Sequence, residues 1–214
     1  IFHFALVSPL TAEFAKLNHG RVLQYHNVTP AHFFAPYDAN IFRLAALSRA
    51  DLKTLVGHTD VALGDSEFNR QDLEALGFPR TAVLPVVPDF SHLDRAPNWL
   101  VAQDFDDDWT NILFVGRVIA NKKIENLIRY FHAYHTSVNP RSRLLIVGAQ
   151  SGFERYLASL HQLTATLGTS HVHFIGHVSD EELVAFYELA DLFLCASEHE
   201  GFCVPLVEAF YKQV

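Results

Sequence analysis

The stretch Ala190–Ala209 reads ADLFLCASEHEGFCVPLVEA. Its apolar run, Leu192–Ala196, is typical of a buried strand in a parallel sheet. A polar loop follows this run, and Pro205 stands where the first turn of a helix is expected. In open α/β sheets, ligands bind at the carboxyl ends of such strands. This strand–loop–helix unit therefore predicts a binding site.

Two carboxylates, Glu200 and Glu208, flank the start of the expected helix, with seven residues between them. Free backbone N–H groups at a helix start attract anions such as phosphates. Carboxylates accept hydrogen bonds from hydroxyl groups. Phosphates together with hydroxyls favour a nucleotide sugar as the ligand. The pair alone also fits two ordinary surface residues, because exposed carboxylates are common.

The segment Glu198–Ala209 resembles the E-x7-E segment of the retaining nucleotide-sugar glycosyltransferases, in particular glycosyltransferase family 4. The resemblance includes Gly201 and Phe202 after the first Glu, and Pro205 three residues before the second. Cys203 stands where the family usually has a second glycine. This departure predicts that the backbone at Cys203 has less room to approach a bound phosphate.

A second motif, GRVIANKK, begins at Gly116 after an apolar run typical of a buried strand. Arg117 as a planar fork and Lys122 as a point charge can converge on a diphosphate from one loop. Two ordinary surface cations are the alternative. Family 4 has a similar Gly-Arg-x4-Lys here, and the resemblance implies that these two cations hold the donor's diphosphate. The family often has glycine where Lys123 stands.

The resemblance extends into the N-terminal half of the chain. Tyr25–Pro30 is similar to the strand end whose histidine approaches the donor sugar in this family, which implies that role for His26. Because His26 is one of 13 histidines, a structural role fits the residue equally well. Asp65–Asn69 and Leu84–Pro85 resemble later landmarks of the same domain.

Alternating strand and helix patterns along the chain predict an α/β protein with parallel sheets. The expected strands cover residues 21–25, 60–64, 81–88, 111–115, 143–147, 172–176 and 192–196. Helices are expected over residues 41–56, from a Ser66 cap to Gly77, along the apolar faces Ile124–Phe131 and Phe153–Leu160, and after a capping box at Ser179–Glu182.

The resemblance implies the GT-B fold, in which two Rossmann-like parallel-sheet domains face a cleft, both incomplete in this chain. We expect an acceptor-side N-terminal domain over residues 1–95, a linker over 96–110 and a nucleotide-sugar-binding domain over 111–214. The acidic run Asp104–Asp108 is interpreted as a solvated loop in preference to a cation site. The chain has no Met and stops inside an expected helix at Val214, so we expect a fragment with both ends missing.

Composition excludes several classes of protein. A net charge of -8 argues against a general nucleic-acid binder. No 18-residue apolar span and no signal-peptide pattern occur. The two cysteines, Cys195 and Cys203, are expected to be reduced and buried in a cytoplasmic protein. Metal-ligand spacing is absent from the sequence.

The resemblance implies transfer of a sugar from a nucleotide-sugar donor to a glycan or lipid-linked acceptor, with retention of anomeric configuration, in polysaccharide or glycoconjugate synthesis. Glu200 and His26 are then expected beside the sugar, Glu208 beside the ribose, and the amides of Gly201 and Phe202 beside phosphate. No metal or cofactor is expected, because cations and helix dipoles neutralise the leaving diphosphate. A cytoplasmic location is expected, with peripheral association at the inner face of a membrane also compatible.

Three other functions compete with this interpretation. A Rossmann dehydrogenase would need G-x-G-x-x-G after a strand, and neither Gly116 nor Gly148 opens that pattern. A sugar-nucleotide epimerase of the same two-domain fold stays open, as does a catalytically inactive protein that binds a nucleotide sugar.

Overall fold

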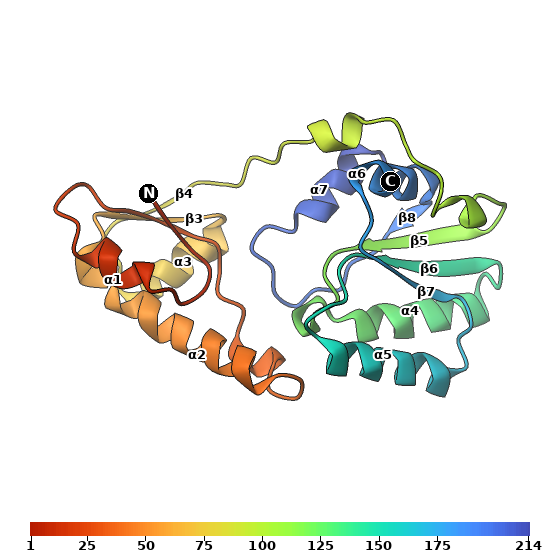
Figure 1. Ribbon diagram of the computed structural model, residues 1–214, viewed down its shortest axis with the longest axis horizontal. Helices are drawn as coiled ribbons and strands as arrows, with labels where there is room; N and C mark the ends of the chain where they lie inside the picture. Colours follow the sequence, from red (N-terminus) through yellow and green to blue (C-terminus); the bar gives the residue numbers. More distant parts are fainter. The chain divides into compact units, whose positions relative to one another are not determined.

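The computed structural model describes residues 1–214, and the chain divides into two compact units. Unit 1 comprises Ile1–Val87 and His199–Phe202, and unit 2 comprises Pro88–Glu198 and Cys203–Val214. Each unit contains its own four-stranded sheet, and every strand pair is parallel (Figure 1). The structure thus has the α/β class with two parallel sheets that the sequence predicts.

The sheet of unit 1 has the strand order β1-β2-β3-β4. Its strands are short: β1 (Phe2–Phe4), β2 (Val22–Tyr25), β3 (Val61–Gly64) and β4 (Thr81–Val83). The edge position of β4 agrees with the prolines predicted to close it. The strand ends at Val83 instead of reaching Pro88, since Pro85 and Pro88 cannot donate to a ladder.

Three helices accompany this sheet, α1 (Leu10–Ala15), α2 (Ala39–Thr54) and α3 (Glu67–Leu76). The predicted caps of α3 are confirmed. The Ser66 hydroxyl accepts a hydrogen bond from the Asn69 N–H, and Gly77 ends the helix with a φ of 102°. The apolar core of the unit includes residues from the sheet, α2 and α3: Phe4, Leu23, Tyr25, Leu52 and Leu73.

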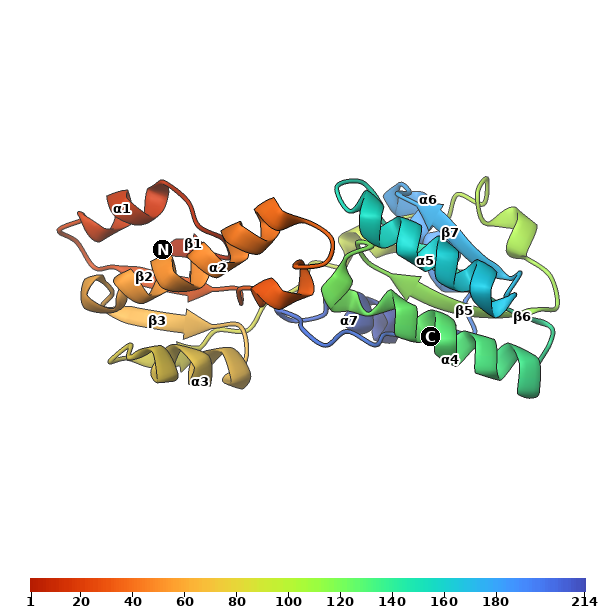
Figure 2. The same ribbon diagram turned by 90° about the horizontal axis from the view of Figure 1, so that it is seen from below.

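The sheet of unit 2 has the strand order β7-β6-β5-β8. Its strands are β5 (Thr110–Val115), β6 (Ser142–Val147), β7 (Val172–Gly176) and β8 (Leu192–Phe193). Four helices cover it, α4 (Ile124–Ser137), α5 (Glu154–Leu167), α6 (Asp180–Leu189) and α7 (Val204–Tyr211). Helices α4 and α5 lie side by side on one face of the sheet, and α6 and α7 lie on the other (Figures 1 and 2).

The strand predicted over Leu192–Ala196 is shorter than expected. Only Leu192 and Phe193 pair with β5, at the edge of the sheet, and Leu192 is 49% exposed. The apolar run suggested a strand buried on both sides, but in this structure β8 has a neighbour on one side only. Cys195 and Cys203 are correspondingly half-buried free thiols and not the buried residues expected.

The segment expected to be a linker, residues 96–110, lies within unit 2 and packs against its core. Ala102 is fully buried, and Trp99 and Phe105 contact the same apolar cluster. The four aspartates of the acidic run are exposed, as expected for a solvated loop, and two of them also form ion pairs, Asp107 with the buried Arg143 and Asp108 with Arg141. The chain leaves unit 1 earlier, at Val87. None of the helices combines the length and apolar character needed to cross a membrane.

Candidate functional site

At the carboxyl ends of β5 and β6 in unit 2, main-chain groups and not side chains form the surface. Gly116 follows β5 with a φ of 154°, and Gly148 follows β6 with a φ of 141°. A Cβ added to Gly148 would lie only 2.1 Å from the Gly116 carbonyl oxygen. The Gly148 N–H in turn donates to the carbonyl of Gly176, at 2.8 Å. Side chains are therefore excluded from this junction, and main-chain groups form its surface.

Arg117 and Lys122 both lie on the loop between β5 and α4. The exposed guanidinium of Arg117 lies over the ring of Phe153, 5.5 Å from its centroid. Lys122 is half-buried and ends a short 3-10 helix, Ala120–Lys122. The structure thus places both cations on the strand-end loop expected from the sequence. Their contact with a diphosphate stays a prediction.

Two helices of unit 2 begin at a residue in the left-handed backbone region. Lys123, at the start of α4, has a φ of 52°, and Cys203, at the start of α7, has a φ of 62°. Non-glycine residues pay roughly 1–2 kcal/mol in this region. These are the two positions where the resembling family tends to have glycine, so the backbone keeps a conformation suited to glycine at both. The Lys123 ammonium lies 3.6 Å from Glu125 and 3.4 Å from Glu198.

Glu208 is buried on α7, and both of its carboxylate oxygens have protein partners. Its Oε1 lies 3.1 Å from His92 Nε2, and its Oε2 accepts a hydrogen bond from the Tyr187 hydroxyl at 2.9 Å. Burial, reinforced by this carboxylate, raises the pKa of Tyr187. Each oxygen retains a second lone pair, so a further hydrogen bond to a ribose hydroxyl is compatible with this arrangement. The contacts of Glu208 with His92 and Tyr187 also hold α7 against the rest of unit 2.

The strand ends of unit 1 carry side chains instead. His26 follows β2 and Asp65 follows β3, and His26 Nδ1 lies 2.8 Å from Asp65 Oδ2. The other ring nitrogen, Nε2, lies 2.8 Å from Nδ1 of His3 on β1. A carboxylate can only accept, so the proton of His26 belongs on Nδ1, and Nε2 then accepts from His3. Asp65 is buried, and the Gln24 amide donates to its second oxygen.

The main chain of Glu200 and Gly201 packs against the same strand end. The Asn27 side chain donates to the Glu200 carbonyl at 3.0 Å, and a Cβ on Gly201 would lie 3.0 Å from the His26 carbonyl oxygen. The structure therefore brings His26, Glu200 and Gly201 together within unit 1, with the half-buried Phe202 following them. The remaining predicted residues, Arg117, Lys122 and Glu208, belong to unit 2.

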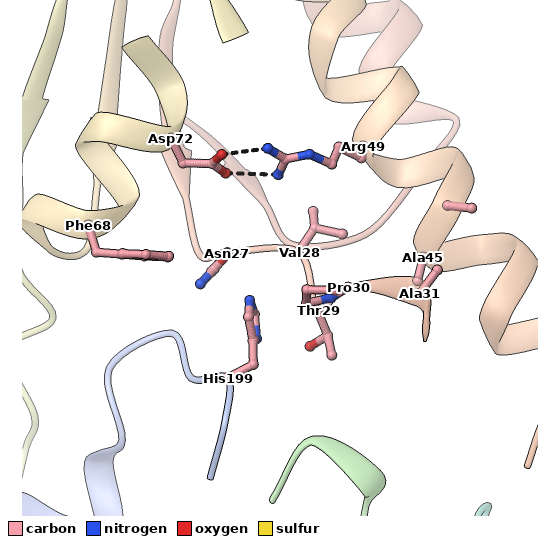
Figure 3. A pocket seen from close by; sticks show the side chains of 11 residues that line it. Asn27, Val28, Thr29, Pro30, Ala31, Ala45, Arg49, Phe68, Asp72 and His199 are labelled. Carbon is pink, nitrogen blue, oxygen red and sulfur yellow. Dashed lines mark hydrogen bonds and ion pairs between the residues drawn. The ribbon is translucent and has the colours of Figure 1, made fainter. Parts of the chain in front are cut away.

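A cavity of about 400 Å³ adjoins this cluster in unit 1 (Figure 3). The cavity is lined mostly by small and apolar side chains; the full lining is Asn27, Val28, Thr29, Pro30, Ala31, Ala45, Ala46, Arg49, Phe68, Asp72 and His199. Arg49 and Asp72 form a two-pronged ion pair, with N–O distances of 2.9 and 2.5 Å. The hydroxyl of Tyr25 lies 2.9 Å from the same carboxylate.

Protonation in this cavity is set by that ion pair. Hydrogen bonds from Arg49 lower the pKa of Asp72, and Asp72 in turn raises the pKa of Arg49. Burial raises the pKa of Tyr25 to about 12. At neutral pH the pair is therefore fully ionised, and its two charges cancel.

Sequence reasoning missed four of the residues that shape these sites. His3 and Asp65 could have been found, because each lies on a strand or directly after one at the same sheet edge as His26. Arg49 and Asp72 carried no such signal, since they are 23 residues apart on two different helices. No group of three or more His, Cys, Asp or Glu residues is arranged to hold a metal ion.

Comparisons with known proteins agree with this architecture. A family model described as "Glycosyl transferases group 1" matches residues 97–214. The chain is 30% identical over 157 residues to a mannosylfructose-phosphate synthase of Agrobacterium fabrum, which covers 70% of this chain and 33% of that protein.

Two solved structures share the fold. A sucrose-phosphate synthase from Thermosynechococcus elongatus superposes with a TM-score of 0.69 at 19% identity, over 91% of this chain and 48% of its own. HepE of Anabaena, in complex with UDP and glucose, has a TM-score of 0.67 at 20% identity, over 88% of this chain and 50% of its own. The chain thus spans a third to a half of the length of these proteins, and its fold is of the GT-B type. Because the family model covers more than half of the sequence, the chain belongs to the group 1 glycosyl transferases.

Proposed function

We propose that the protein transfers a sugar from a nucleotide-sugar donor to a hydroxyl of an acceptor, with retention of anomeric configuration. The observation that carries this proposal is the backbone-lined strand edge of unit 2, where Gly148 meets Gly116, beside a loop with Arg117 and Lys122. Main-chain groups that exclude side chains allow close approach of a diphosphate, and two cations neutralise it. The similar structure of HepE from Anabaena, in complex with UDP and glucose, supports the same class of donor.

In this proposal the residues of unit 1 act on the sugar. Glu200 and His26 bind its hydroxyls, and Asp65 keeps the His26 proton on Nδ1. Arg117 and Lys122 stabilise charge on the leaving diphosphate, without a required metal. The acceptor hydroxyl attacks the anomeric carbon from the face that the nucleotide leaves, which preserves the anomeric configuration. The bond from that carbon to the diphosphate breaks as the new bond forms, and the hydroxyl proton passes to the leaving phosphate oxygen. The order of events involves no protein nucleophile.

In this proposal, only a short stretch of backbone near the start of α7 donates N–H groups to phosphate. Pro205 has no N–H, and the Leu206 N–H is bonded to the Cys203 carbonyl at 3.1 Å. Backbone donors near the start of α7 are therefore drawn from residues 201–204, which include the predicted Gly201 and Phe202.

Product analysis tests the proposal. The enzyme at its full natural length is incubated with UDP-, GDP- and ADP-sugars and an acceptor panel, and NMR of the products reports the anomeric configuration. Transfer with the donor's configuration, undiminished by a chelator, is expected. An inverted product would disprove retention. Formation of an epimerised sugar nucleotide would favour the epimerase, and binding without turnover would favour an inactive binding protein. A role in polysaccharide or glycoconjugate synthesis and a cytoplasmic location remain predictions from the sequence.

A further inference from the structure

The cavity of unit 1 borders the residues predicted to hold the donor sugar. One wall, Asn27–Ala31, directly follows His26 in the chain, and another wall residue, His199, directly precedes Glu200. Hydrogen bonding between Asn27 and the Glu200 carbonyl joins the two walls. A group held in this cavity would therefore lie next to the sugar, which is where an acceptor must be placed. This step rests on the function proposed above.

The lining suits the faces of a sugar ring. Phe68 is 69% exposed, and its ring points into the cavity from one side, opposite the apolar group formed by Val28, Pro30 and Ala31 (Figure 3). Small-molecule sites typically combine such apolar walls with a few placed polar groups. Here the polar groups include the Arg49–Asp72 pair at one end and His199 at the other, with Asn27 and Thr29 also in the lining (Figure 3).

The charge of the lining restricts the acceptor further. Arg49 is the one Lys or Arg side chain that lines the cavity, and both of its terminal nitrogens are engaged by Asp72. Asp72 is also the one Asp or Glu, so the formal charges of the pair cancel. A phosphate monoester would bring roughly two negative charges at neutral pH. It would then meet only an Arg49 already neutralised by Asp72 and the imidazole of His199, or would have to displace Asp72 from Arg49, and both arrangements leave more negative than positive charge in a partly desolvated site.

We propose that this cavity receives the acceptor as a neutral, polyhydroxylated group, and that the Arg49–Asp72 pair discriminates against phosphorylated acceptors. The paired side chains can donate to and accept from sugar hydroxyls without being separated. The relatives named for mannosylfructose phosphate and sucrose phosphate would differ from this chain in that respect.

The test compares hexoses with their 6-phosphates. Transfer rates and ligand-observed NMR binding are measured for glucose, fructose and both 6-phosphates, with the full-length enzyme saturated with donor for transfer and with nucleoside diphosphate for binding. We expect kcat/KM for the neutral sugars to exceed that for the phosphates by at least about tenfold, the scale of one charge-assisted hydrogen bond. Preference for the phosphates, or failure of the neutral sugars to bind, overturns the proposal.

Two variants test the role of the ion pair. Asp72→Asn leaves the Arg49 charge uncompensated and should raise the ratio of phosphate to neutral turnover by about tenfold. Ala46→Lys adds a cation to the lining from an exposed position on α2, so it serves if the first variant fails to fold. Glu67→Gln is the matched control, because Glu67 lies on α3 like Asp72 but pairs with Arg70, which does not line the cavity and keeps its second ion pair with Glu74. An unchanged ratio in both test variants would overturn the proposal.

Failure of the transferase function gives a different result. If no sugar is transferred to any acceptor and the nucleotide sugar is not consumed, the proposed reaction is wrong. If neutral hexoses still bind the protein and binding requires Phe68, tested with Phe68→Ala, the cavity proposal survives that outcome.

Discussion

The two sheets present different chemistry at the same topological position. Where strands of unit 2 end, the chain turns through Gly116 and Gly148, and their backbones touch. Where strands of unit 1 end, the chain carries His26 and Asp65, and their side chains are bonded to each other. Both sheets are parallel and four-stranded, so topology alone does not account for the difference.

In the proposed function, this difference assigns the two chemical parts of the donor to two kinds of sheet edge. A junction of glycines exposes main-chain amides and suits a diphosphate, which needs close approach and many donors. A junction of ionisable side chains suits hydroxyl groups, which need both donors and acceptors in fixed positions. The topology of a parallel sheet determines that a ligand binds at its carboxyl edge, and the residues at that edge determine which ligand binds.

The largest expected effect comes from placing a side chain in the glycine junction. Gly148→Ala puts a Cβ 2.1 Å from a backbone oxygen that cannot move away freely. Overpacking and a disfavoured φ together should destabilise unit 2 by more than about 2 kcal/mol, enough to lose its folded state in a marginal domain. Urea unfolding measures the change. Gly57→Ala is the control, since nothing lies within 4 Å of its added Cβ, and equal losses in both variants would contradict this account.

The next largest effect is expected at the side-chain junction. His26→Ala removes an imidazole proposed to position the sugar and should lower kcat by about a hundredfold, the scale of displacing a bound substrate by about 1 Å, with the fold intact. His19→Ala replaces an exposed histidine of the same unit and should leave kcat unchanged. Steady-state kinetics and circular dichroism check both variants. A His26 variant with near wild-type turnover would give this residue the structural role that its partners His3 and Asp65 also permit.

A smaller effect is expected from the cations beside the glycine junction. Arg117→Gln or Lys122→Gln should each weaken nucleoside diphosphate binding by about ten- to a hundredfold, since a charge-assisted hydrogen bond is worth roughly 1.5–3 kcal/mol. Calorimetry measures this loss. Arg129→Gln changes an exposed cation on α4 and should have no effect. Equal affinity of the Arg117 and Lys122 variants to the wild type would refute the diphosphate clamp.

The smallest effect separates the two helix starts of unit 2. Cys203→Gly relieves a left-handed residue and should raise the free energy of unfolding by up to about 1 kcal/mol, after the entropy cost of glycine. Lys123→Gly should give less, because it also removes the ion pairs with Glu125 and Glu198. Denaturant unfolding compares them, with Cys203→Ala as the variant that keeps the Cβ. A gain in Cys203→Ala equal to that in Cys203→Gly would attribute the effect to the thiol.

Local signals in the sequence were enough to predict most elements of both sheets. Each predicted helix end depends only on residues within about four positions of it. This holds for the caps at Ser66 and Ser179, the helix end at Gly77 and the helix start at Pro205. The face Ile124–Phe131 was likewise confirmed, since its four apolar positions are buried. Such features follow from backbone chemistry and periodicity that a sequence displays directly.

Features that depend on tertiary partners were missed. The length of β8 depends on which strands adjoin it, and the packing of Trp99 and Phe105 against unit 2 depends on a surface formed elsewhere in the chain. The pairing of Arg49 with Asp72 requires α2 and α3 to lie together. For the candidate site, sequence motifs supplied the loops, while the side-chain network behind them became visible only in the fold.

A network of hydrogen bonds in unit 1 joins the cavity proposed for the acceptor to the loop of Glu200. The Tyr25 hydroxyl has one proton, which it shares between the Asp72 carboxylate at 2.9 Å and Asn27 Oδ1 at 3.2 Å, and the Asn27 amide donates to the Glu200 carbonyl. Changes at Asp72 should therefore be epistatic with changes at Asn27, because both act on one network. Substitutions at Ala46 and Phe68 leave that network in place, because these side chains cannot join it. If the cavity receives the acceptor as proposed, its apolar wall can be redesigned for another acceptor without disturbing the polar network.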